Sequence, residues 1–182
     1  MKWTYTFLVL AVLLTGCGRF IPTEIESNKL LGIIPIQYGK GSYQATQQVR
    51  ASREDIFRQA RRWAAFHVPD PSAALSISDN MLGDIITYGS IASVSLQEKR
   101  LYVNLPSVQY SASIECYDNA YRVTLTNFVM QGQPTPHPIE VRNTDISKKR
   151  ARLQYEAIDQ KVITILESID GFIRSEVASV PR

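Results

Sequence analysis

Hydrophobic residues recur at two different spacings along the chain, and the spacing separates helices from strands. Residues 43–50 are predicted to form a strand, and Ser52 then stands where a helix N-cap belongs, with acidic residues in the following turn. From Ile56 to Phe66 the apolar residues follow at helical intervals, while arginines occupy much of the remaining circumference. The sequence therefore predicts an amphipathic helix that packs one face and ends before the prolines beyond it.

The period changes to two over the next part of the chain, as expected for strands. Residues 73–78 alternate, and we expect the following run, residues 84–96, to bury one face made of Ile86, Tyr88, Ala92, Val94 and Leu96. Residues 107–117 alternate most regularly, with Val108, Tyr110, Ala112, Ile114 and Cys116 on the apolar side. Asp118 and Asn119 make a tight turn into a strand whose apolar side is Tyr121, Val123 and Leu125. This pattern predicts half-buried antiparallel strands.

A long helix is predicted over about residues 148–178, with Asp145 or Ser147 as its cap. Its apolar stripe has a three-four spacing and consists of Tyr155, Ile158, Val162, Ile165, Ile169 and Phe172. The stripe either covers the sheet or pairs with a second copy in a coiled coil. Covering the sheet is favoured, because the sheet otherwise has no second layer. An oligomer formed through this helix is the alternative.

The first residues have the pattern of a bacterial lipoprotein signal. Lys2 supplies a positive charge, and an apolar run from Phe7 to Leu13 is too short for a helix that spans a bilayer, which needs about 20 residues. Leu14, Thr15, Gly16 and Cys17 then resemble a lipobox. That resemblance implies cleavage after Gly16 and acylation of Cys17, so that lipid on Cys17 makes the membrane a partner.

Removal of residues 1–16 from the 182-residue chain leaves 166 residues, enough for one domain and a tether. Residues 17–42 contain Gly32, Pro35, Gly39 and Gly41 and are predicted to form a half-ordered tether that could extend about 80 Å. Its apolar centre is expected to dock on the domain or pair at a sheet edge. Residues 43–182 are predicted to form a single α+β domain.

The net charge bears on the possible partners of the protein, and the cysteine content bears on how the chain is stabilised. The formal net charge of +3 becomes +2 when Lys2 is removed, so the charge balance indicates no nucleic-acid partner. Only two cysteines are present, and lipidation would use Cys17. Core packing, rather than an internal disulfide, is therefore expected to hold the mature chain together.

The order strand, helix, four strands, helix is that of each half of the TATA-binding protein. The stretches that resemble a known family are Ser52 to Trp63 with Phe57 and Ala60, Ile77 to Ser90 with Asp79, Gly83, Ile85 and Gly89, and Tyr121, Arg122, Val123 and Asn127. They resemble an uncharacterised family of bacterial, mostly lipoprotein or secreted, domains of unknown function with a TATA-binding-protein-like fold. The resemblance implies a curved antiparallel sheet covered on one face by helices, in the order β-α-β-β-β-β-α. It assigns no catalytic residue.

Polar residues on the outward side of the predicted strands are the candidate binding surface. The residues expected to form this face are Ser111, Ser113, Glu115, Arg122 and Thr124, with Thr87 also on the outward side. A face rich in hydroxyl groups suits a peptide, a glycan or a partner protein. The alternative is an ordinary solvated sheet face, which antiparallel sheets often have. Glu115 and Arg122 are expected to form a cross-strand ion pair.

Motifs for catalysis, metal binding or cofactor binding are missing from the sequence. The chain has two histidines, His67 and His137, and neither has the spacing of a metal-binding or hydrolytic motif. His67 is predicted to stabilise a helix end, His137 to lie exposed in a loop, and Cys116 to be a buried, inert thiol. We therefore predict no enzymatic activity, no cofactor and no metal. A hydrolase with an unrecognised active site, in which Glu115 meets a histidine, is the alternative.

Four cations begin the last helix, where they oppose the helix dipole: Lys148, Lys149, Arg150 and Arg152. They are expected either to be solvated or to meet anionic headgroups or an acidic partner. Together, the sequence predicts a lipid-anchored protein of the cell envelope, on the periplasmic side of the outer membrane. It is expected to bind an envelope protein, peptide or glycan non-covalently, or to be an accessory component of an envelope assembly.

Overall fold

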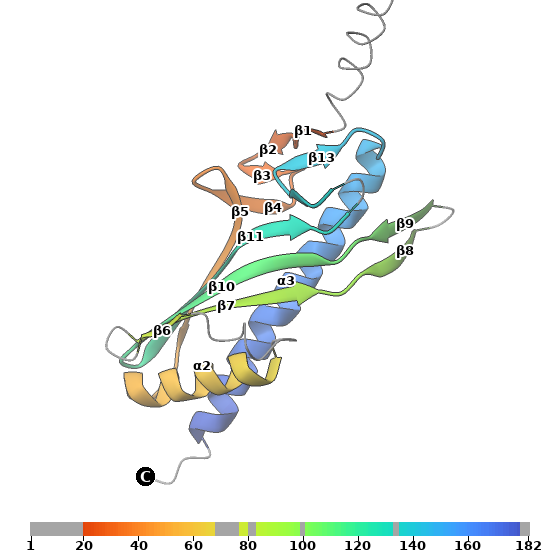
Figure 1. Cartoon of the computed structure of the whole chain (residues 1–182). Coiled ribbons are helices and arrows are strands. Elements are labelled where there is room, and N and C mark those ends of the chain that lie inside the picture. The colour runs from red at the N-terminus through yellow and green to blue at the C-terminus, as the bar shows by residue number, and fades with distance from the viewer. Residues whose placement is uncertain (1–19, 68–76, 80–82, 99–100, 133–134, 179–182) are drawn as a thin grey trace, which may run out of the picture.

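The computed structural model describes residues 20–67, 77–79, 83–98, 101–132 and 135–178. Its main element is an antiparallel sheet in the order β2-β3-β4-β5-β11-β10-β7-β6, with β12 paired to β11 (Figure 1). The strands of this sheet are β2 (Ile25–Glu26), β3 (Lys29–Leu30), β4 (Ile34–Gln37), β5 (Lys40–Gln48), β6 (Ile77–Asp79), β7 (Asp84–Ile91), β10 (Val108–Tyr117), β11 (Ala120–Met130) and β12 (His137–Pro138). The expected α+β architecture with an antiparallel sheet is confirmed.

Two helices, α2 (Arg53–His67) and α3 (Lys148–Ala178), lie on one side of the sheet and contact each other (Figure 1). Tyrosines of the sheet reach α3, since Tyr43 donates a hydrogen bond to Asp159 (2.6 Å) and Tyr121 donates one to Asp170 (2.6 Å). Burial and these acidic partners raise the pKa of both tyrosines. The last helix therefore serves mainly to cover the sheet. Among described residues, Ile163 is the one large apolar side chain of α3 that is exposed.

Both helices begin where the sequence predicts. The Ser52 hydroxyl accepts a hydrogen bond from the Asp55 backbone N–H (3.2 Å) and donates one to the Asp55 carboxylate (2.9 Å). The hydroxyl of Ser147 accepts a hydrogen bond from the Arg150 backbone N–H (3.4 Å). Each cap satisfies a backbone donor that the first helical turn leaves free. No helix in the described part of the chain is both long and apolar enough to cross a bilayer.

The alternation predicted for β10 and β11 is confirmed, because their apolar sides are buried against the helices. The prediction for β7 is wrong by one residue. Thr87 and Gly89 face the core, and Tyr88 is exposed. Gly89 lies opposite Tyr110 in the register, and a Cβ atom on it would be 2.3 Å from the Tyr110 ring. Because Thr87 and Gly89 occupy the two middle inward positions, between the buried Ile85 and Ile91, hydrophobicity alone points to the wrong face.

The prediction of one continuous strand over residues 84–96 is wrong. β7 ends at Ile91, and the chain continues as a separate hairpin of β8 (Val94–Glu98) and β9 (Leu101–Leu105). This hairpin extends from the sheet beside the first half of α3 (Figure 1). The Gln154 side chain holds it there by donating a hydrogen bond to the Asn104 carbonyl (2.7 Å). The predicted strand over residues 73–78 lies outside the described residues except for Ile77 and Ser78, which belong to β6.

The tether predicted over residues 17–42 is largely folded. β1 (Phe20–Pro22) pairs with β13 (Val141–Asn143), and the β2-β3-β4 turns bury Leu30, Leu31 and Ile34 completely or nearly so. These apolar residues remove water from the sheet edge, which a solvated linker would not do. The described domain therefore begins at Phe20 rather than at Tyr43, and Gly16 and Cys17 lie outside the described residues.

Candidate functional site

The five residues of the predicted binding face do lie together on the open side of β10 and β11. Ser113 is opposite Thr124 in the register, and Glu115 is opposite Arg122, with an ion pair of 3.2 Å between their side chains. Ser111 lies one pair further along the same face. All five side chains are half-buried. The predicted cross-strand ion pair is confirmed.

Two tyrosines border this polar sheet face. Tyr88 lies opposite Ser111, and the Tyr117 hydroxyl donates a hydrogen bond to Glu115 (2.5 Å) that raises the pKa of Tyr117. The Arg122 guanidinium carbon lies 5.7 Å from the centre of the Tyr117 ring. The prediction that Thr87 lies on this face is wrong. Its hydroxyl is buried on the core side and has no hydrogen-bond partner among the described residues.

A cavity of about 570 Å³ lies at the other end of the molecule, where no site was predicted. Its walls come from four places: the β8-β9 hairpin, the end of β11, the β12-β13 segment and the first turns of α3. We call it the end cavity. Its apolar surface comes from residues such as Val94, Leu105, Met130 and Ala151. A volume of this size falls within the range of small-molecule sites, about 300–1,000 Å³.

Hydrogen-bonding groups line part of the end cavity, and none of the described lining residues is acidic. Arg142 is one of them. Its guanidinium donates to the Ile146 carbonyl (3.4 Å) and lies 3.7 Å from Glu24, while its buried Nε has no hydrogen-bond partner in the described part of the chain. Asn143 accepts a hydrogen bond from the Asp145 backbone N–H (2.8 Å). The lining thus offers apolar contact together with neutral and positively charged donors.

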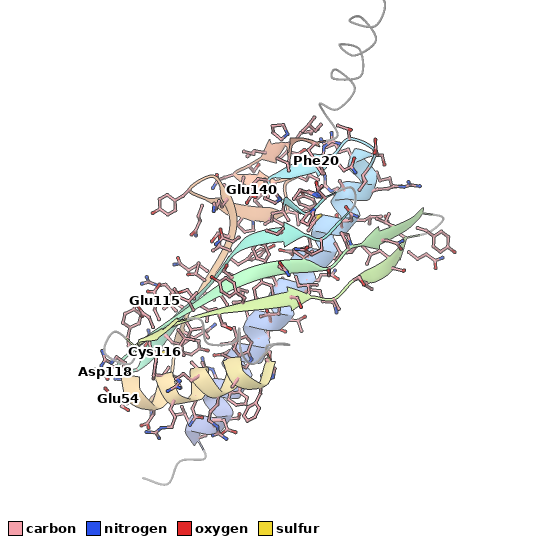
Figure 2. The ribbon with its side chains drawn as sticks, in the orientation of Figure 1. Phe20, Glu54, Glu115, Cys116, Asp118 and Glu140 are labelled. Carbon is pink, nitrogen blue, oxygen red and sulfur yellow. The ribbon has the colours of Figure 1, made fainter. Side chains whose placement is uncertain are left out.

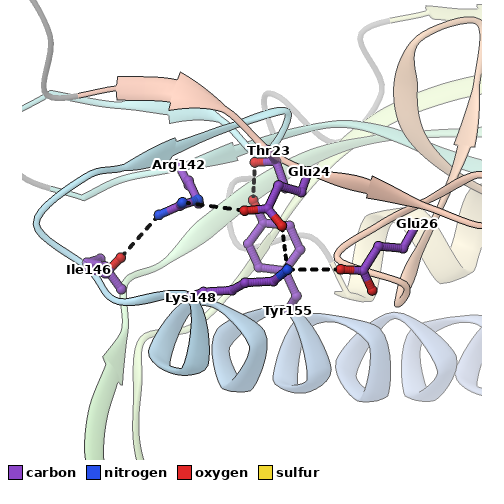
Figure 3. A network of polar contacts seen from close by, with 7 residues as sticks. All are labelled: Thr23, Glu24, Glu26, Arg142, Ile146, Lys148 and Tyr155. Carbon is purple, nitrogen blue, oxygen red and sulfur yellow. Dashed lines mark hydrogen bonds and ion pairs between the residues drawn. The ribbon is translucent and has the colours of Figure 1, made fainter.

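A polar network behind the end cavity joins the first strands to α3 (Figure 3). The Tyr155 hydroxyl donates to the Ile139 carbonyl (2.5 Å) and contacts the Thr23 hydroxyl (3.0 Å), which also donates to the Ile139 carbonyl (3.0 Å). Burial raises the pKa of Tyr155 to about 12. Tyr155 therefore remains a neutral donor at any physiological pH.

Lys148 forms the exposed half of this network, where it binds both Glu24 and Glu26. The hydrogen bond from Lys148 lowers the pKa of Glu24, and the same contacts raise the pKa of Lys148. One of the four cations at the start of α3 is thus paired inside the molecule. Arg152 is paired with Glu156 (3.5 Å).

The candidate catalytic side chains are not brought together. Figure 2 shows Glu115 and Cys116 at one end of the sheet and Phe20 and Glu140 at the opposite end. His137 is at the Phe20 end, where the two rings lie 4.5 Å apart, and His67 stacks on Trp63 in α2. The prediction that His137 is exposed is wrong: the ring is buried because β12 pairs with β11 and Phe20 packs against it.

Cys116 is buried as predicted, and burial raises the pKa of its thiol to about 12. His67 ends α2, where its Nδ1 lies 3.0 Å from the Trp63 carbonyl. Among the described residues, no group of three or more histidine, cysteine or acidic side chains is placed to hold a metal ion.

Family comparison agrees with this architecture. Residues 46–131 match the model of DUF4468, a domain of unknown function with TBP-like fold. This stretch of the chain is similar to the DUF4468 family. It contains α2, the central strands and the β8-β9 wall of the end cavity, whereas β12, β13 and α3 follow after the matched residues.

Two solved structures are similar in fold to this chain. A TBP-like protein from Parabacteroides distasonis has a TM-score of 0.53 and 18% identity, and the match covers 75% of this chain and 97% of that chain. A DUF4468 family protein from Bacteroides ovatus has a TM-score of 0.55 and 17% identity, and covers 87% of this chain and 97% of that chain. Comparison with curated proteins finds no match. The TBP-like fold predicted from the sequence is therefore confirmed.

Sequence reasoning missed the end cavity because its walls are far apart in the chain. Asn104 and Gln154, which close one wall, are separated by 50 residues. One signal was available: Val94, Leu96, Val103 and Leu105 alternate with polar residues on both sides of a lysine-arginine pair, which is typical of a hairpin. The hairpin alone would not have revealed the cavity.

Proposed function

We propose that the protein is anchored in the cell envelope by lipid on Cys17 and binds a ligand non-covalently, without enzymatic activity. The periplasmic face of the outer membrane is the proposed location. The support for anchoring is the short apolar segment followed by the lipobox residues Leu14 to Cys17. The proposed ligand is an envelope protein, peptide or glycan. The protein either binds this ligand by itself or is an accessory component of an envelope assembly.

The end cavity is the observation that carries the proposal of binding. It combines an apolar lining with donors such as Arg142 and Gln154, the combination that fixes both the affinity and the orientation of a ligand. A small part of an envelope molecule, such as an apolar side chain with a neighbouring carbonyl or anionic group, fits this lining. The absence of acidic side chains among the lining residues that the structure describes favours neutral or negatively charged groups over cations.

The alternatives receive less support from the described residues. A hydrolase would need a nucleophile or an acid-base pair. The described hydrogen bonds of Glu115 are with Tyr117 and Arg122, and Glu115 is not among the residues that line the end cavity with His137. An oligomer formed through α3 would need exposed apolar residues on both sides of that helix. Most of its stripe is instead packed in the core.

The polar sheet face is a second candidate site for a larger ligand. Tyr88 and Tyr117 are about half exposed and stand at its border, where their rings could stack on sugars or peptide side chains. Replacing Tyr88 and Tyr117 by Ala tests this face separately from the end cavity, because neither residue lines the cavity.

Binding in the end cavity is tested by filling it. Ala151→Phe and Val94→Trp add side-chain volume from two different walls of the end cavity. The control is Ala65→Phe, which also replaces alanine by phenylalanine but at an exposed position of α2. Protein extracted from the native envelope is analysed by native mass spectrometry. We expect a co-purified mass in the wild type and in Ala65→Phe that both cavity variants lose. Retention of that mass by both cavity variants contradicts binding in the end cavity.

Anchoring is tested by metabolic labelling with palmitate. We expect label on the wild-type chain, no label on Cys17→Ser, and release of Cys17→Ser from the membrane fraction. An unlabelled wild-type chain contradicts the proposed anchoring.

A further inference from the structure

The distance between the proposed lipid and the folded domain is short. Gly18 and Arg19 alone separate Cys17 from Phe20, the first residue of β1. Three residue steps span at most about 11 Å even when fully extended. Since β1 is fixed to β13 by strand pairing, a lipid on Cys17 would hold this part of the domain against the membrane.

Several elements meet at this end of the molecule. Figure 1 shows β1, β2 and the start of α3 together, opposite the end that carries α2. The Lys148 contacts bind the first turn of α3 directly to Glu26 in β2 and to Glu24, which lies between β1 and β2 (Figure 3). We call the surface made by β1, β2 and residues 148–150 the anchor end.

Apolar side chains are exposed on the strands of the anchor end. Ile21 in β1 is 37% exposed, and Ile25 in β2 is 64% exposed. Single exposed isoleucines are common on soluble proteins. Ile21 and Ile25, however, lie one and five residues after Phe20, where the described chain begins. They are therefore close in sequence to the proposed lipid on Cys17.

Cations at the anchor end complete the pattern. Lys148 is paired with two acidic residues, whereas Lys149 and Arg150 are exposed and form no ion pair with any residue that the structure describes. Their position in the first turn of α3 is unfavourable with respect to the helix dipole. An anionic bilayer surface would supply the missing counter-charge, because lysine and arginine close to such a surface are attracted to its headgroups.

We propose that the anchor end rests on the bilayer, with Ile21 and Ile25 at the level of the headgroups and with Lys149 and Arg150 against anionic lipid. This inference rests on the proposed acylation of Cys17. It gives the domain a fixed orientation, in which α2 points away from the membrane. The end cavity lies on the membrane side, because Arg142 and Tyr155 belong both to its lining and to the network behind the anchor end.

The orientation is tested with a fluorescent label that responds to its surroundings. Ile25→Cys places a thiol at the anchor end, and Arg61→Cys places a control thiol on the exposed side of α2. Cys116 does not compete, because it is buried and its thiol has a raised pKa. The acylated full-length mature proteins are labelled with a nitrobenzoxadiazole maleimide and reconstituted in vesicles of phosphatidylethanolamine and phosphatidylglycerol.

We expect a nitroxide on the lipid headgroups to quench the label at position 25 at least threefold more than the label at position 61. Equal quenching at the two positions overturns the inference. The mass of the N-terminal peptide is measured in the same samples. A peptide without acyl chains overturns the proposed function together with the inference, whereas an acylated protein whose label at position 25 stays in water overturns the inference alone.

The role of charge is tested in the same vesicles. Lys149→Glu with Arg150→Glu reverses two charges at the anchor end, and Arg58→Glu with Arg61→Glu reverses two charges on α2 as the matched control. We expect the first pair to reduce quenching of the label at position 25 at least twofold and the control pair to leave it unchanged. Unchanged quenching in the first pair overturns the proposed contact with anionic lipid.

Discussion

Replacement of Tyr155 by Phe removes one hydroxyl from the interior and tests how the first strands are attached to α3. The side chain is 1% exposed, and its hydroxyl contacts the Ile139 carbonyl and the Thr23 hydroxyl. After the change, the Ile139 carbonyl still accepts the hydrogen bond from Thr23. We therefore expect a loss of about 1 kcal/mol, the usual net value of one hydrogen bond, rather than the larger cost of an unsatisfied buried group.

Thr23→Val makes the complementary change, because the Tyr155 hydroxyl can still donate to the Ile139 carbonyl. Its expected cost is likewise about 1 kcal/mol. The double variant removes both described donors from a carbonyl of a fully buried residue. Its loss should exceed the sum of the single losses by about 1–2 kcal/mol, because only there is the acceptor left unsatisfied.

Urea unfolding of the Cys17→Ser chain measures these free energies. With an m-value of about 2 kcal/mol/M, each single change should lower the midpoint by about 0.5 M. Tyr38→Phe is the control, because the same oxygen is removed from a fully exposed tyrosine, and its midpoint should not move. If the two single losses add within about 0.5 kcal/mol in the double variant, the Ile139 carbonyl does not depend on this pair of donors, and our account of the network is wrong.

Three further predictions concern the core and the sheet. Gly89→Ala should destabilise the domain by about 1–3 kcal/mol, because the new methyl group would meet the Tyr110 ring; an unchanged melting temperature would contradict this packing. Cys116 should not react with a thiol reagent at pH 8 until the protein is unfolded, since burial raises its pKa to about 12; rapid labelling of the native protein would show otherwise. Burial acts to raise the pKa of Asp170, but the hydrogen bonds from Arg174 and Tyr121 outweigh it and lower that pKa below its usual 3.8. The ionised Asp170 carboxylate therefore stabilises the fold fully above about pH 4, and this stabilisation is lost as the pH falls through the folded-state pKa of Asp170. Asp170→Asn should accordingly have a lower free energy of unfolding than the wild type at pH 6, and the difference should be smaller at pH 3.

Sequence patterning predicted the elements whose burial repeats with the period of the backbone. The caps at Ser52 and Ser147, the alternation of β10 and β11 and the apolar stripe of α3 all depend on residues within a few positions of one another. The predicted polar sheet face follows from the same alternation, because side chains two apart in a strand share a side. Its five residues are together for this reason.

Alternation failed where packing, rather than hydrophobicity, selects the inward residue. In β7 the inward positions include Thr87 and Gly89, and the exposed position is Tyr88. Gly89 faces inward because the ring of Tyr110 from the neighbouring strand fills the space above it. The sequence of β7 alone does not show that the Tyr110 ring packs against Gly89.

What the sequence by itself determined is therefore the type of most elements and the exposed side of β10 and β11. The tertiary structure alone decided that the chain is folded from Phe20 onward, that a cavity forms beside α3, and that Lys148 is paired. The physical reason is distance along the chain: Thr23 meets Tyr155 across 132 residues, and Lys148 meets Glu24 across 124. Local periodicity constrains neighbours in sequence, whereas contacts of this range exist only after the sheet has brought its edge strands to the first turn of α3.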